Sequence, residues 1–224
     1  MSPIIYYGGV IALFLFILGF AIRFARIFSF YKKKDKPEEP APKSKKSILK
    51  GILYTLKEVT VGWFSPFRFE RGGRVSVLYV PSVIMHITII IVLIFGPAAH
   101  MVFWSRLFGQ SSYPVLPMSF SDALTILAMI SVALLLSRRA IFTLTKSPMA
   151  GISGVSDFFW LVILLLAIIF GYLAVHNIGD YSLLLSAHYI SVEILVALTP
   201  WTKMSHVVLG WVSKGLYGWE SGTG

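Results

Sequence analysis

The chain has 224 residues, of which 56% are hydrophobic and 13% are charged, and its mean hydropathy is +0.77. A soluble globule of this size could not bury so large an apolar fraction, so the composition indicates an integral membrane protein and excludes an ordinary soluble domain. The net charge of +10 does not indicate nucleic-acid binding, because the cations gather in segments that flank apolar stretches.

Five apolar segments are long enough to be predicted as membrane-spanning helices. The first is expected to remain as an anchor, because it has no basic start and no small-residue cleavage site. The sequence therefore predicts an all-α integral membrane protein with five transmembrane helices and a single membrane domain over residues 1–224. The predicted spans are approximately 4–29, 76–103, 118–137, 156–176 and 182–209.

A basic segment, residues 31–75, separates the first two predicted spans and holds twelve of the twenty Lys and Arg residues. Its first part, 32–46, is rich in Lys and Pro, which predicts a solvated linker or an arm lying on anionic headgroups. Its second part, 47–67, has apolar residues at three- and four-residue intervals. That spacing predicts an amphipathic helix, which would lie at the membrane interface or dock a partner subunit.

The other basic residues set the predicted orientation. The segment 138–146 and the C-terminal end, with Lys203 and Lys214, are basic, whereas Arg106 stands alone in the connections on the opposite side. Cytoplasmic loops of membrane proteins carry an excess of Lys and Arg. We therefore expect the N-terminus outside, and both basic loops and the C-terminus in the cytoplasm.

Four of the five histidines lie in two of the predicted spans. His86 and His100 are fourteen residues apart in the second span, and His188 and His206 are eighteen apart in the fifth. On continuous helices, at about 100° per residue, each pair returns close to one face. The pairs would be separated by roughly 21 Å and 27 Å, which places one histidine of each pair near each leaflet of a ~30 Å hydrocarbon core.

The antiparallel course of these two spans predicts which histidines meet. His100 would face His188 in an outer layer, and His86 would face His206 in an inner layer. Two neutral imidazoles are the axial ligands of a low-spin b-type haem, so the pattern predicts two haem b groups inside the helix bundle. The alternative is a haem-free membrane anchor or a small transporter, in which the histidines are packing groups or proton relays.

Two further residues bear on this prediction. His176 closes the fourth span and is interpreted as an outer-interface residue rather than a ligand. Pro97, three residues before His100, would kink the second span and change the direction of His100. The absence of Cys excludes an iron–sulfur cluster or a covalently attached c-type haem in this sequence, so electrons would have to pass to another chain.

The run Leu198-Thr-Pro-Trp-Thr-Lys-Met-Ser-His206 resembles the Pro-aromatic-x-(Lys/Arg)-x-x-His signature of the nitrate reductase γ-subunit superfamily. That superfamily includes the cytochrome b subunits of heterodisulfide reductase and of DsrM-type complexes. The resemblance implies an electron-transfer subunit in the cell membrane of a prokaryote, with no complete reductase activity of its own. Electrons would pass from a membrane quinol, or methanophenazine, through the outer and then the inner haem to a cytoplasmic iron–sulfur subunit. Nothing in the residues sets this direction, and flow toward quinone stays open.

Three polar residues are candidates for contacts with these groups. Lys203, within the signature, is the best candidate for pairing with a haem propionate. Arg106, on the outer side, would pair with an outer propionate or approach the quinol headgroup. Glu193, just over one turn after His188, would accept a quinol proton or be a neutral carboxyl bonded between helices.

Overall fold

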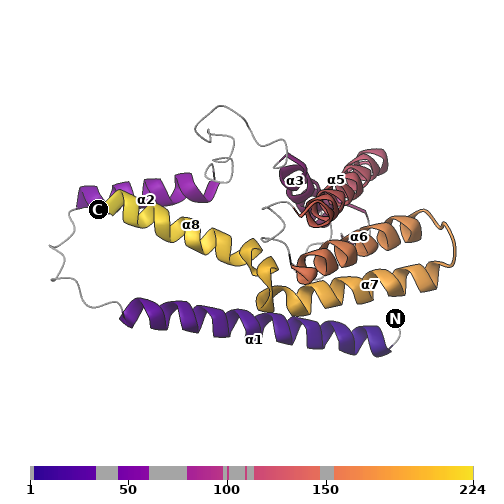
Figure 1. Ribbon diagram of the computed structural model, residues 1–224, viewed down its shortest axis with the longest axis horizontal. Helices are drawn as coiled ribbons and strands as arrows, with labels where there is room; N and C mark the ends of the chain where they lie inside the picture. The colour runs from indigo at the N-terminus through magenta and orange to yellow at the C-terminus, as the bar shows by residue number, and fades with distance from the viewer. Residues whose placement is uncertain are drawn as a thin grey trace. The chain divides into compact units, whose positions relative to one another are not determined.

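The computed structural model describes residues 3–33, 45–60, 80–97, 114–146 and 154–223, together with His100 and Gly109. All regular secondary structure in these residues is helical (Figure 1). The elements are α1 (Pro3–Lys33), α2 (Lys45–Thr60), α3 (Val80–Phe95), α5 (Met118–Leu144), α6 (Val155–Val175), α7 (Tyr181–Leu198), the 3₁₀ turns η3 (Thr199–Trp201) and η4 (Lys203–Ser205), and α8 (His206–Thr223).

Four stretches of helix are long and apolar enough to cross a membrane: Tyr7–Ile27, Met118–Leu144, Val155–Val175 and Tyr181–Trp201. They overlap the first, third, fourth and fifth predicted spans, so the prediction of an all-helical protein with several helices able to span a membrane is confirmed for the described residues. Where the second span was predicted, the described helix is α3, with 16 residues. At about 1.5 Å per residue it reaches roughly 24 Å, which is less than a ~30 Å hydrocarbon core.

The prediction of continuous helices through both histidine pairs is wrong. Helix α3 ends at Phe95, before Gly96 and Pro97, and His100 therefore lies beyond its end. Helix α7 ends at Leu198, and two 3₁₀ turns separate it from α8, which begins at His206. Proline lacks the N–H that a continuous helix needs, and Pro200 stands at the start of η3. The helical spacing of 14 and 18 residues therefore does not determine where these side chains point.

The predicted linker, residues 32–46, is helical at both ends, which was not expected. The linker was predicted over 32–46, but α1 continues to Lys33 and α2 begins at Lys45. The predicted amphipathic helix over 47–67 is found as α2, which ends at Thr60. Residues 34–44 and 61–67 lie outside the described part of the chain.

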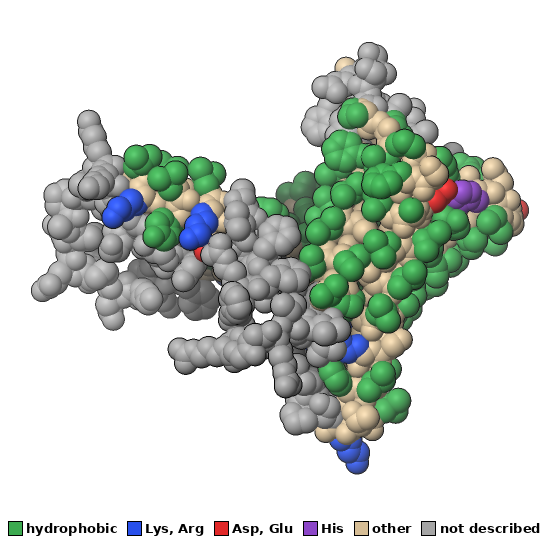
Figure 2. Space-filling model, turned by 90° about the horizontal axis from the view of Figure 1, so that it is seen from above, with side chains coloured by type: hydrophobic (Ala, Val, Ile, Leu, Met, Phe, Trp, Pro, Cys, Tyr) green, Lys and Arg blue, Asp and Glu red, His purple; other side chains and the backbone are tan. Residues whose placement is uncertain are grey.

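The chain forms two compact units, one of residues 1–10 and 76–195 and the other of residues 11–75 and 196–224. In the first unit α5 packs against both α3 and α6. Its core centres on Met85, Val132 and Leu161. Hydrophobic side chains predominate on the described surface visible in Figure 2, as expected for helices that face lipid.

An ion pair and a helix cap join α5 to α6 at one end of the first unit. Asp157 is only 7% exposed and lies 3.1 Å from the Arg139 guanidinium. The same carboxylate accepts the backbone N–H of Gly154 at 3.0 Å, which satisfies a donor at the start of α6. Arg139, one of the basic residues used above to predict the orientation of the chain, therefore also forms an ion pair within the protein.

In the second unit α2 packs along α8 (Figure 1). The Thr55 hydroxyl donates to the carbonyl of Gly215 at 3.3 Å, and Lys214 lies 3.6 Å from Glu58. In the same unit α1 packs on the 3₁₀ turn through Gly19, where an added Cβ would lie 2.6 Å from Pro200. Pro200 is fully buried, so the turn that interrupts the last predicted span is itself a packed element.

Candidate functional site

The structure brings His100 and His188 together in the first unit. Their ring centres are 6.4 Å apart and their planes differ by 23°. His188 lies in the second turn of α7, and His100 follows the turn that ends α3. A hydrogen bond of 2.9 Å from the His100 backbone N–H to the carbonyl of Pro97 shapes that turn. The interrupted helix thus places His100 beside His188.

Backbone carbonyls fix the protonation of both rings. Nδ1 of His188 lies 2.7 Å from the carbonyl oxygen of Ala167, and Nδ1 of His100 lies 3.0 Å from that of Val92. A carbonyl can only accept, so each Nδ1 carries the hydrogen and donates it. In the neutral ring Nε2 then holds a lone pair, which is the form of imidazole that binds a metal.

A glycine makes the position of His188 possible. A Cβ added at Gly171 of α6 would lie 2.8 Å from Nδ1 and 3.0 Å from Cε1 of His188. Real Cβ atoms do not approach so closely, so only glycine lets the ring lie against α6 and reach the carbonyl of Ala167, one turn earlier. Sequence reasoning assigned no site to the glycines and therefore missed Gly171.

The second predicted pair consists of His86 and His206. Nδ1 of His86 donates to the carbonyl of Ser82 at 2.6 Å, and Nδ1 of His206 donates to that of Lys203 at 2.7 Å. Both rings therefore have the same tautomer as the first pair. His86 is half-buried on α3 in the first unit, and His206 is exposed at the start of α8 in the second. The predicted meeting of these two histidines stays a prediction.

His176 differs from the other four histidines. Its Nε2 lies 3.0 Å from Oδ1 of Asp122 at the start of α5, and its ring centre is 4.4 Å from that of Tyr172. The atom that would bind a metal is thus engaged by a carboxylate on a neighbouring helix. His176 therefore joins the end of α6 to the start of α5, and its predicted position at the outer interface stays a prediction.

Glu193 faces a different neighbour from His188. Its carboxylate lies against Gly8 and Gly9 of α1, where an added Cβ at Gly9 would be 3.5 Å from Oε1. Five residues after His188, it is turned by about 140° around α7. The carboxylate therefore lies on the α1 side of the helix, whereas His188 contacts α6.

Of the other two residues predicted to contact cofactor or substrate, the structure describes Lys203. Lys203 is exposed in η4, and its carbonyl holds His206. Arg106 lies outside the described residues.

The distance between the His100 and His188 rings can be compared with the distance expected for two imidazoles that hold one iron. No group of three or more His, Cys, Asp or Glu side chains that could hold a metal occurs in the described parts of the chain. Two imidazoles on opposite sides of one iron, with bonds of about 2 Å and Nε2 about 1 Å from each ring centre, have centres about 6 Å apart. The observed 6.4 Å is close to this distance.

The chain is 33% identical over 158 residues to a protein of Nitratidesulfovibrio vulgaris, a match that covers 70% of this chain and 67% of that protein. The chain belongs to the same family as this bacterial protein. No activity is stated for that protein, so the match shows that the two chains are related but indicates no function. No family model matches the chain, and no solved structure matches it significantly.

Proposed function

We propose that this protein is a dihaem cytochrome b subunit of a membrane oxidoreductase complex, in which His100 and His188 hold one haem. The observation that carries the proposal is the pair of rings 6.4 Å apart, each with Nδ1–H donated to a carbonyl. Each ligand of an iron needs one ring nitrogen with a lone pair and often donates the other ring N–H to a carbonyl, which this tautomer allows, whereas a proton relay sets no such condition. A b-type haem in this position would supply a one-electron redox centre within the bundle.

The second haem is assigned to His86 and His206. Both present the same tautomer, held by a carbonyl three or four residues earlier in the chain. The carbonyl of Lys203 accepts from His206, and its ammonium group would pair with a propionate of the haem that His206 is proposed to hold. Five membrane spans, with the N-terminus outside, would place this haem on the cytoplasmic side.

The substrate is proposed to be a membrane quinol or methanophenazine, oxidised near the outer haem, with electrons leaving to a cytoplasmic iron–sulfur subunit. The sequence contains no Cys, so a cluster that receives the electrons must belong to another chain. Glu193 and Arg106 are the candidates for quinol contact. Glu193 faces α1 rather than the histidine pair, so a proton released by the quinol and accepted by Glu193 would leave it at the α1–α7 boundary.

Haem content tests the proposal directly. The purified chain, produced with haem supplied, should contain about two b haems per polypeptide by pyridine haemochrome and reduced-minus-oxidised spectra. His188→Ala or His100→Ala should remove one spectral component and leave the other, and His206→Ala or His86→Ala should do the reverse. His176→Ala is the matched control and should keep both, because its Nε2 is engaged by Asp122.

Two results would decide against this function. A chain without haem under these conditions would favour the haem-free anchor or small transporter. Loss of haem in His176→Ala equal to the loss in His188→Ala would mean that any histidine substitution disturbs the fold, and the ligand assignment would then lose its support.

A further inference from the structure

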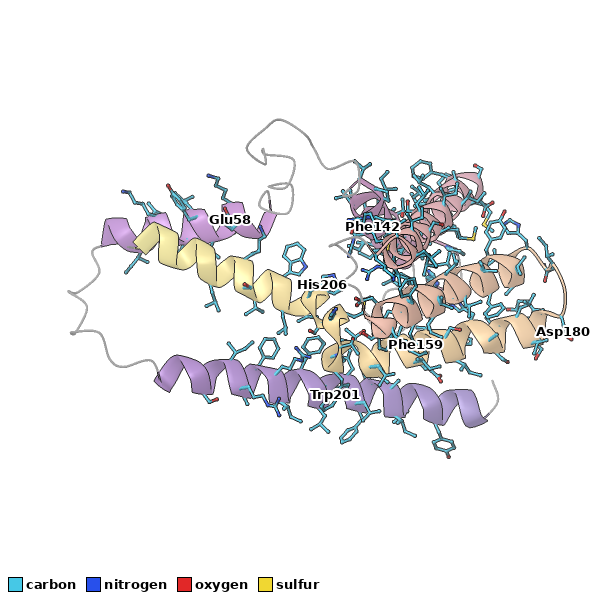
Figure 3. All side chains as sticks on the ribbon, in the orientation of Figure 1. Glu58, Phe142, Phe159, Asp180, Trp201 and His206 are labelled. Carbon is cyan, nitrogen blue, oxygen red and sulfur yellow. The ribbon has the colours of Figure 1, made fainter. Side chains whose placement is uncertain are left out.

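Helix α2 turns a polar face toward its partner helix. Gly51 is buried, the Thr55 hydroxyl donates to Gly215 of α8, and Glu58 pairs with Lys214 of α8. These three positions of α2 are four and three residues apart, so they share one face. Figure 3 labels Glu58 on α2, where α2 runs beside α8.

The opposite face of α2 is apolar and exposed. It consists of four large side chains, called here the α2 stripe: Leu49, Ile52, Leu53 and Leu56, which are 58%, 46%, 56% and 55% exposed. At about 100° per residue the stripe lies roughly 150° away from the face that packs on α8. A helix of a soluble protein buries its leucines and exposes its polar residues. In α2 this order is reversed, which indicates that the stripe meets an apolar environment.

The charges of α2 favour an anionic lipid surface as that environment. The helix carries Lys45, Lys46, Lys50 and Lys57 against the single acid Glu58. Lys50 and Lys57 are exposed on the flank of the stripe, and Lys57 lies 5.5 Å above the Tyr54 ring. Lysines beside a leucine stripe match a helix that lies in a membrane interface, with its apolar face in the acyl boundary and its cations at the headgroups.

The chain also keeps α2 close to a membrane. Eleven residues, 34–44, separate the end of α1 from the start of α2, and fully extended they span at most about 40 Å. Helix α1 contains the candidate membrane span Tyr7–Ile27. A helix tethered at this distance meets lipid at high effective concentration, whereas a partner protein has to be recruited from solution. We infer that the α2 stripe binds the surface of a leaflet that contains anionic lipid.

The absence of Cys allows a direct test, which does not depend on haem. Spin labels are attached to Leu53→Cys, in the stripe, and to Tyr54→Cys, its exposed neighbour on another face. Each full-length variant is placed in nanodiscs of phosphatidylcholine with and without phosphatidylglycerol. Collisions of the label are measured with oxygen, which concentrates in lipid, and with a nickel chelate, which stays in water. Circular dichroism establishes that both variants keep the helical content of the parent chain.

With phosphatidylglycerol, the label at 53 should collide several-fold more with oxygen than with nickel, and the label at 54 should show the reverse. Without it, the label at 53 should move toward the behaviour of the label at 54. Equal access of nickel to both labels would overturn the inference. A label at 53 that is shielded from both agents would mean that protein covers the stripe, and equal insertion in both lipids would overturn the role of the anionic headgroup.

Discussion

Substitution of Gly171 by Ala tests the proposed outer haem site without touching a ligand. The added Cβ would lie 2.8 Å from Nδ1 of His188, whereas carbon contacts become comfortable at about 3.5 Å. The ring must therefore retreat by about 0.7 Å. A retreat straight away from α6 would lengthen the 2.7 Å bond to the Ala167 carbonyl to about 3.4 Å, beyond the usual range of an N–H···O bond.

Loss of the hydrogen bond that orients a ligating histidine lowers metal affinity by about 10–100-fold. We therefore expect Gly171→Ala to raise the haem dissociation constant of the outer site by this factor. The measurement is a haem titration, followed by Soret absorbance, of apo-protein in a His206→Ala background, which keeps the proposed outer site alone. Gly9→Ala is the control, because its Cβ would meet Glu193 at 3.5 Å, an ordinary contact. Equal haem affinity in the two variants would refute the reasoning.

Two further predictions concern stability in detergent. Asp157→Asn should lower the free energy of unfolding by about 1–3 kcal/mol, because Asp157 is buried and bonds both Gly154 and Arg139. Urea unfolding followed by circular dichroism measures this change, and a loss below about 0.5 kcal/mol, as at an ordinary surface site, would contradict the assigned bonds. Gly19→Ala should cost about 1–3 kcal/mol by overpacking, since its Cβ would lie 2.6 Å from Pro200. A thermal midpoint equal to that of the parent chain would show that α1 does not pack on the 3₁₀ turn.

Hydropathy located the membrane helices because the thickness of the bilayer imposes a length on them. The fourth predicted span, 156–176, differs from α6 (Val155–Val175) by one residue at each end. The third, 118–137, is too short, since α5 continues to Leu144. The apolar run ends at Arg138, but the helix does not, because Arg139 finds the carboxylate of Asp157 on α6. Such a partner comes from tertiary structure and leaves no signal in local hydropathy.

The pairing of His100 with His188 agrees with the sequence-based expectation, which rested on the antiparallel course of the two spans. The separate argument, that each histidine pair lies on one face of a helix, was wrong. The argument from helical phase required unbroken helices, and each of the two is interrupted between its histidines. Pro97 is a kink that the sequence itself indicates. Pro200 stands in the run that resembles the family signature, and the structure shows that it also lies in the first 3₁₀ turn. Depth along the bundle depends little on helical phase, which is why the pairing survived the loss of the phase argument.

Both histidines of this pair are held by the same arrangement, a hydrogen bond to a helical carbonyl that lies one turn before a glycine. Sequence reasoning overlooked this arrangement. His100 donates to Val92 and His188 donates to Ala167, and each acceptor stands four residues before a glycine, Gly96 and Gly171. At Gly171 a side chain would occupy the space of the ring itself, and at Gly96 it would lie 3.0 Å from the backbone carbon of Val92. A helical carbonyl is normally covered by the residue one turn later, so a glycine there opens it to a second donor. A glycine one turn after a helical carbonyl, near the depth of an intramembrane histidine, therefore indicates where that histidine can be held.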